Sequence, residues 1–111
     1  MITKRNVVAL FTDKEIWATV PGYIGLEAST LGNLRHSDTG KHYKLTPNGQ
    51  GQLLTRVHLT GSTGTSVLRY ASQLVMLAFI GEAPAGTRLK RRNKVKTDNR
   101  LINLYFQPFG K

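Results

Sequence analysis

The segment RLKRRNKVKTDNRLINLYF, residues 88–106, begins as a dense basic run and ends as an amphipathic stretch. Seven of its first thirteen residues are Lys or Arg, and Asp98 is the single acid among them. Thr97 or Asp98 could accept the free N–H groups at a helix start, and Leu101 and Leu104 would then lie three residues apart on one face. The segment therefore predicts a short helix that follows a cationic stretch.

The whole chain shares this positive charge. It has 111 residues, with 16 Lys and Arg against 6 Asp and Glu, a formal net charge of +10 and no cysteine. Such a balance is typical of domains that bind nucleic acid, because Lys and Arg displace counterions from phosphates; an anionic membrane surface is the competing interpretation. The longest apolar stretch, 74–81, is too short to cross a bilayer, and the start lacks the pattern of a signal peptide. We therefore expect a cytoplasmic protein without membrane contact.

Short β-rich runs separated by Gly-rich turns extend as far as Tyr70. NVVALF predicts a strand or an arm within residues 1–14, PGYIG at 21–25 is typical of a turn, and 26–36 predicts two strands around a turn at Gly32. HYKL, PNGQGQ and LLTRVHL together have the pattern of a hairpin, and TGSTGTS before VLRY indicates a further turn between β-formers.

The hydrophobic period changes at Ala71. ASQLVMLAFIGEAP predicts a helix of about three turns, with Ser72 as the N-cap candidate and with Gly81 and Pro84 as stop signals. The predicted fold class is thus α+β, in which a small antiparallel sheet or set of β-hairpins is followed by a segment with two short helices.

Three pieces of the sequence resemble the phage HNH homing endonucleases in order and spacing. EIWATVPGYIGLEASTLGNLRH (15–36) resembles the Trp, Gly-Tyr and aromatic-Glu-Val-Ser-Asn-Leu-Gly-Arg-Val-Arg pattern of their N-terminal NUMOD4-like module. SQLVMLAFI (72–80) resembles His-Arg-Leu-Val-Ala-X-Ala-Phe-Ile, and KRRNKVKTDNRLINLYF (90–106) resembles Asp-His-Ile-Asp-Gly-Asn-Lys-Thr-Asn-Asn-Arg-Leu-Glu-Asn-Leu-Glu-Trp. The resemblance implies a β-rich DNA-binding module over 15–70 and a degenerate HNH-like ββα element over 71–111, joined in one compact unit.

The departures from the family pattern fall on the residues that carry its chemistry. The resemblance implies an Asp that holds a divalent metal, a His beside it that activates water, and a His that opens the helix; these positions hold Lys90, Arg91 and Ser72. The family's later metal-binding Asn has no counterpart after Asn103. Lys and Arg offer no lone pair to a metal, and Arg does not titrate near neutrality. We therefore expect no catalytic residue, no metal, no cofactor and no enzymatic activity.

The basic residues of both halves are the candidates for contact with DNA. In the family the ββα element lies against the DNA backbone, so the run at 88–100 is predicted to bind phosphates, with a solvated loop as the alternative. Cations of the N-terminal hairpins are candidates for phosphate or base-edge contacts, with plain surface charge as the alternative. The candidates are Arg35, Lys41, Lys44, Arg56, Arg69, Arg88, Lys90, Arg91, Arg92, Lys94, Lys96 and Arg100.

The leading hypothesis is a protein without nuclease activity that binds double-stranded DNA. It would serve a phage or mobile element as a transcription repressor or as a blocker of a site. The runner-up is an inhibitor that uses the same surface on an acidic host or competitor protein. RNA binding is the third alternative, because a basic surface does not separate RNA from DNA, and an active nuclease is the fourth. No heptad pattern indicates a dimer, so the oligomeric state stays open.

Overall fold

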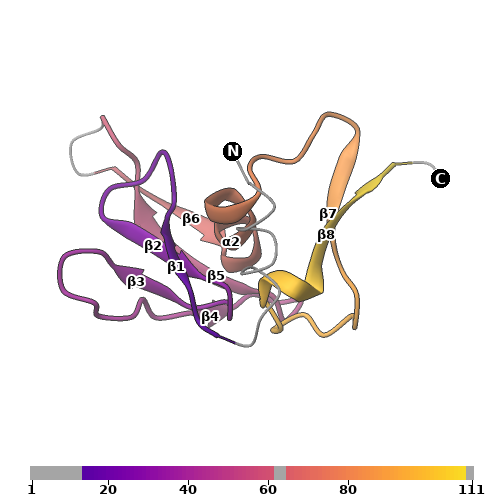
Figure 1. The fold of residues 1–111 in the computed structure, drawn as a ribbon, viewed down its shortest axis with the longest axis horizontal. Coiled ribbons are helices and arrows are strands. Elements are labelled where there is room, and N and C mark those ends of the chain that lie inside the picture. The colour runs from indigo at the N-terminus through magenta and orange to yellow at the C-terminus, as the bar shows by residue number, and fades with distance from the viewer. Residues whose placement is uncertain (1–13, 62–64, 110–111) are drawn as a thin grey trace.

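The computed structural model describes residues 14–61 and 65–109, so the strand or arm predicted within 1–14 lies outside the described residues except for Lys14. Three antiparallel sheets and one α-helix make up this described part (Figure 1). The first sheet contains β1 (Trp17–Thr19), β2 (Leu26–Ser29) and β3 (Leu34–His36). The second contains β4 (Thr46–Pro47), β5 (Leu53–His58) and β6 (Ser66–Tyr70), and the third pairs β7 (Thr87–Arg91) with β8 (Leu104–Pro108).

The first sheet confirms the two strands predicted around Gly32. Leu26, Ala28 and Leu34 alternate with more polar residues, and all three are buried in the core. Gly32 makes the turn with φ +88°, a conformation that favours glycine because a Cβ would crowd the backbone. The alternation therefore places one face of this sheet against the helix α2 (Ala71–Phe79).

The second sheet contains the predicted hairpin with a shorter first strand. Residues 42–45 do not pair with β5, because Tyr43 donates its N–H to the carbonyl of Leu34 at 2.9 Å and His42 forms a bridge with Arg35. Only Thr46–Pro47 pairs with β5. The start of the segment HYKL (42–45) thus lies along β3 and not along β5 as predicted.

The helix α2 follows β6 without a connecting loop. The prediction of Ser72 as N-cap is wrong: Tyr70 occupies that position without a side-chain cap, and Ser72 lies buried in the first turn. The predicted stop at Gly81 agrees with the structure, since its N–H donates to the Met76 carbonyl at 2.8 Å with φ +126°. None of the described helices is long and apolar enough to span a bilayer.

The second predicted helix is wrong. After the 3₁₀ turn η1 (Leu101–Asn103), the chain becomes β8 and pairs with β7 along its whole length. Leu101 donates its N–H to the carbonyl of Thr30 at 2.9 Å, so this turn is held by the β2–β3 connection. Tyr105 and Phe106 favour a strand once such a partner exists. The described part of the chain is therefore α+β with antiparallel sheets and one α-helix.

Candidate nucleic-acid interface

The β7–β8 hairpin carries the densest charge and divides it between two faces. Arg88 lies opposite Gln107, and Lys90 lies opposite Tyr105. Side chains directly opposite each other in an antiparallel pair point to the same face, so these four share the outer face. On the inner face Leu89, with its neighbours on β8, packs against the hydrophobic core. The pairing thus turns an alternating sequence into one cationic face and one apolar face.

Lys90 and Arg91 are adjacent in β7 and therefore point in opposite directions. Lys90 is exposed, whereas Arg91 is half-buried and donates from Nη2 to Oδ1 of the buried Asn99 at 2.5 Å. Burial lowers the pKa of the Arg91 guanidinium, and the charge of Asp98 opposes that shift. Nε of Arg91 and Nδ2 of Asn99 are both buried without a hydrogen-bond partner. Arg91 is thus an internal cation, and Lys90 faces solvent.

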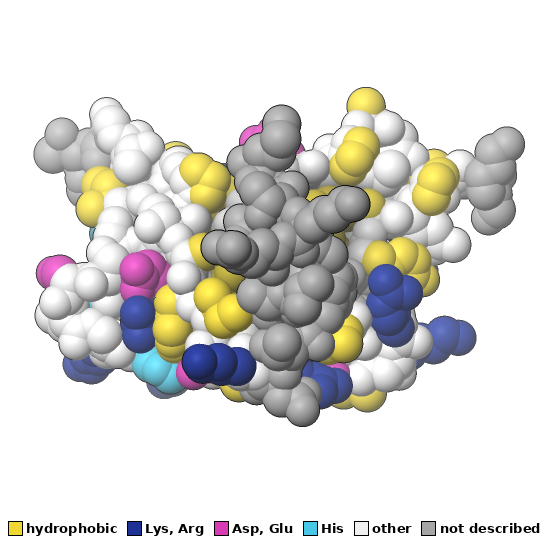
Figure 2. Space-filling view, in the orientation of Figure 1, with side chains coloured by type: hydrophobic (Ala, Val, Ile, Leu, Met, Phe, Trp, Pro, Cys, Tyr) yellow, Lys and Arg dark blue, Asp and Glu magenta, His cyan; other side chains and the backbone are white. Residues whose placement is uncertain are grey.

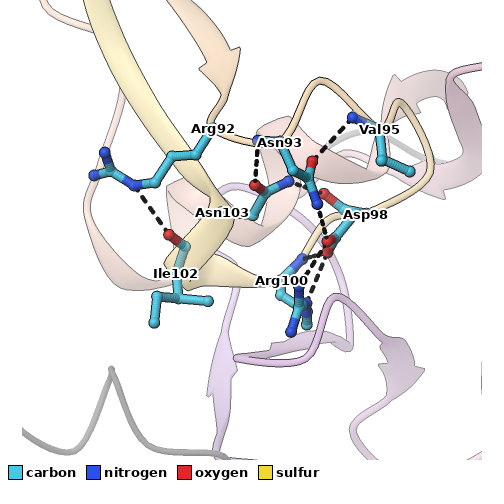
Figure 3. Close-up of polar contacts among 7 residues, drawn as sticks. All are labelled: Arg92, Asn93, Val95, Asp98, Arg100, Ile102 and Asn103. Carbon is cyan, nitrogen blue, oxygen red and sulfur yellow. Dashed lines mark hydrogen bonds and ion pairs between the residues drawn. The ribbon is translucent and has the colours of Figure 1, made fainter.

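The loop between β7 and η1 is held by its own polar side chains (Figure 3). Asp98 accepts hydrogen bonds from Nδ2 of Asn93 at 2.7 Å and from Nε and Nη2 of Arg100 at 2.9 and 2.8 Å. The bonds from Arg100 lower the pKa of Asp98 to about 2, although burial opposes that change. Lys94 has φ +62°, the one positive φ among the described non-glycine residues. The loop therefore has a defined shape that presents its cations outward.

Asn103 and Arg92 join this loop to the hairpin (Figure 3). The buried side chain of Asn103 accepts from the N–H of Asn93 at 3.0 Å and donates to the carbonyl of Asp98 at 2.9 Å. Arg92 donates from Nε to the carbonyl of Ile102 at 3.1 Å, and its guanidinium carbon lies 4.9 Å from the ring centroid of Tyr105. These contacts limit the motion of the Arg92 guanidinium plane.

Two turns of the N-terminal half contact the same loop. Nζ of Lys96 donates to the carbonyl of Gln50 in the β4–β5 connection at 2.8 Å. A Cβ on Gly32 would lie 2.8 Å from the carbonyl carbon of Asn99, so the β2–β3 turn touches the loop backbone. Segments distant in the sequence therefore meet at this loop.

The predicted cations of the N-terminal half lie in different settings. Arg35 is paired with Glu27 at 2.7 Å and lies 4.0 Å from the ring centroid of Trp17, so its charge is partly neutralised. Arg69 is half-buried and donates from Nε to the hydroxyl of Tyr23 at 2.9 Å. Arg56 is exposed on the face of β5 that points away from α2, as Val57 points toward the core. Lys41 and Lys44 are also exposed.

The visible cations gather on one side of the molecule. Figure 2 shows the Lys and Arg side chains of this face across its lower half, from the left side to the right, and none among the coloured residues of its upper border. In the same view, the loop between β7 and η1 and the turn before β5 lie at the lower edge (Figure 1). The two turns therefore lie on the side of the molecule along which the visible cations are spread.

The metal that the resemblance implies does not fit the residues at the implied positions. Lys90 and Arg91 carry cationic groups without a lone pair, and Arg91 is already bound to Asn99. Across residues 14–61 and 65–109, no group of three or more His, Cys, Asp or Glu side chains is placed to hold a metal ion. Ser72, the third altered position, is buried in α2.

Sequence reasoning missed two residues of this region. Tyr105 and Gln107 share the cationic face of the hairpin. The alternation Arg-Leu-Lys with Tyr-Phe-Gln is a period-2 signal that could have indicated paired strands. Because residues 101–106 were predicted to form a helix, this period-2 pattern was not used to predict a strand.

The described part of the chain is a small α+β fold, and an HNH homing endonuclease has a similar fold. The structure of the HNH homing endonuclease I-HmuI, described for DNA binding and cleavage, is similar to this chain with a TM-score of 0.71 and 20% sequence identity. The match covers 84% of this chain and 52% of that chain, so this chain spans about half the length of its structural neighbour. Comparison with protein-family models gives no match, and comparison with curated proteins gives none either. The predicted likeness to the HNH fold is therefore confirmed, while the NUMOD4-like module and the degenerate motif stay predictions.

Proposed function

We propose that this chain binds double-stranded DNA through the cationic side described above and does not cleave it. The observation that carries the proposal is the outer row of Arg88, Lys90 and Arg92 on the hairpin, in a fold shared with a protein that binds and cleaves DNA. Lys90 of this row stands at the position of the implied metal ligand, and the position of the implied general base holds Arg91, which points into the protein. Cations there attract phosphates and repel a divalent metal.

The loss of cleavage follows from the chemistry of these side chains. Phosphodiester hydrolysis by a metal nuclease needs anionic oxygen ligands and a base that titrates near neutral pH. Lys90 is exposed and cationic, and Arg91 is committed to Asn99. A protein of this kind occupies its site without cutting it, as a phage or mobile-element repressor or site blocker does.

A binding assay and a cleavage assay test the two halves of this proposal. A gel shift with random duplex at low salt should show binding that weakens steeply as salt increases toward physiological concentration. Supercoiled plasmid incubated with the protein and Mg²⁺ or Mn²⁺ should stay intact. Absence of a shift at low salt would refute DNA binding, and metal-dependent nicking would refute the loss of cleavage.

A second candidate function is the binding of an acidic protein. The surface of the second sheet favours this candidate. A depression of about 430 Å³ on the second sheet is lined by Pro47, Leu54 and Leu68 and flanked by Lys44 and Arg56. Leu68 is 51% exposed and adds apolar surface to this depression. If this candidate holds, Leu68→Ser will abolish capture of an acidic partner and leave the gel shift unchanged.

A further inference from the structure

The outer face of the β7–β8 hairpin combines two kinds of hydrogen-bonding side chain. Arg88, Lys90 and Arg92 follow one another at every second position along β7 and just beyond it. Across from them lie Gln107 and Tyr105, which are neutral and half-buried. None of these five residues bears a carboxylate, so none of them repels a nucleic-acid backbone.

The shape of the hairpin suits a groove of duplex DNA. It has two strands only, pairs with neither of the other sheets, and lies at one end of the molecule with its inner face packed on the core (Figure 1). A two-stranded ribbon is narrow enough to enter the major groove. Alternate side chains along a strand are about 6.6 to 6.8 Å apart, close to two base steps of about 3.4 Å each.

The two arginines of this face are already oriented by aromatic rings. The guanidinium carbon of Arg88 lies 4.7 Å from the ring centroid of Phe109, and that of Arg92 lies 4.9 Å from the ring centroid of Tyr105. Such stacking leaves guanidinium N–H groups along the edge of the plane, where phosphate oxygens can accept them. Among the described residues, no hydrogen bond to the side-chain amide of Gln107 is formed.

From these contacts we infer that the hairpin enters the major groove and that Gln107 is a specificity-determining residue that reads an adenine. This inference rests on the proposed DNA binding. A glutamine amide offers one donor and one acceptor in fixed geometry, which matches N7 and N6 of adenine. Arg88, Lys90 and Arg92 contact phosphates and contribute affinity that does not depend on sequence.

Selection of bound sequences from a random duplex pool tests this role with Gln107→Ala. The full-length wild-type protein should select a sequence with a preferred adenine, and the variant should lose roughly tenfold or more of that preference at one position. Gln73→Ala is the matched control, because Gln73 is an exposed glutamine on α2 that lies beside Leu89 and Phe106 of the hairpin's inner face and is not part of the row formed by Gln107 and Tyr105. The control should select the wild-type sequence.

The outcomes separate this inference from the proposed function. If no duplex is bound at low salt, both fail. If wild type binds without sequence preference, or if Gln107→Ala keeps the wild-type preference, the reading role fails and DNA binding stands. Should the alanine variant not fold, as judged by circular dichroism, Gln107→Glu answers the same question: glutamate accepts from N4 of cytosine, so the preference should move from adenine to cytosine.

Discussion

Two neighbouring cations show how much one residue step changes the role of a side chain. Lys90 and Arg91 differ by one position in β7, and strand geometry sends them to opposite faces. The guanidinium of Arg91 donates a hydrogen bond to Asn99 inside the protein and is partly removed from solvent, which lowers its pKa. Lys90 keeps its charge at the surface. Substitutions at these two positions should therefore affect different properties.

Arg91→Ala should lower the free energy of unfolding by about 2 kcal/mol, since Oδ1 of Asn99 would be left buried without a donor. Lys90→Ala is the control and should change it by less than about 0.5 kcal/mol, because its side chain is exposed. Urea denaturation followed by circular dichroism measures both values. Equal losses in the two variants would contradict the internal role assigned to Arg91.

Asp98 gives the loop a pH-dependent contribution to stability. Its pKa is about 2 in the folded protein, below the value of about 3.9 expected in an unfolded chain. A carboxyl group with a lowered folded pKa stabilises the fold above its unfolded pKa, and that stabilisation is lost as pH falls through the folded pKa.

The difference in unfolding free energy between wild type and Asp98→Asn should thus be constant above about pH 5 and shrink between about pH 4 and pH 2. Urea denaturation at a series of pH values measures it. Arg100→Gln should remove most of this pH dependence, because Arg100 is the main donor to Asp98. A difference that does not vary with pH would show that Asp98 is not held as an ionised acceptor.

At the scale of elements, the β2–β3 turn determines where the C-terminal loop lies. Gly32 approaches the backbone of Asn99, and Leu101 donates its N–H to Thr30. These contacts link the first sheet to η1 and leave the following residues extended, so that they pair with β7. A turn in one half of the chain therefore helps to form the hairpin in the other half.

Gly32→Ala should destabilise the protein by about 1 to 3 kcal/mol from backbone strain alone, and by more because the new Cβ would lie 2.8 Å from a backbone atom of Asn99. Gly40→Ala is the matched control: Gly40 also has a positive φ, of +74°, but a Cβ there would meet nothing within 4 Å. Thermal unfolding should thus show a larger drop in Tm for Gly32→Ala. Similar drops for both variants would contradict the contact between the two halves.

For the whole molecule, the main property is a net charge of +10 that the fold distributes unevenly. Some cations are used within the protein, as Arg35 and Arg69 are, and others stay exposed near the loop and the hairpin. Only the exposed cations can release counterions from DNA when the protein binds. The salt dependence of binding therefore reports how many of them contact phosphates.

The plot of log K against log salt should become shallower by about 0.9 for each phosphate contact removed. Lys90→Gln and Lys94→Gln should each produce this change, as both side chains are exposed on the hairpin and its loop. Arg69→Gln should leave the slope unchanged, since its guanidinium contacts Tyr23 and the carbonyl of Leu68. Fluorescence anisotropy with a labelled duplex measures these slopes, and an altered slope for Arg69→Gln alone would assign the interface to the other side of the protein.

Local sequence was enough to predict much of this molecule. The strands around Gly32, the helix that ends before Gly81 and the excess of positive charge follow from short-range spacing, turn residues and composition. These features depend on residues a few positions apart, whose conformational preferences do not need a distant partner. The likeness to the HNH fold was also predictable, because its motifs are linear.

Tertiary structure alone decided the course of 104–108 and the role of each cation. Leu101 and Leu104 have a spacing that suits a helix, yet pairing with β7 and the bond to Thr30 make the segment a strand. The direction of Arg91 into the protein and the position of Gln107 beside Arg88 follow from that pairing. Strand pairing joins residues that are far apart in the chain, so the energy that selects it is absent from any local stretch of sequence.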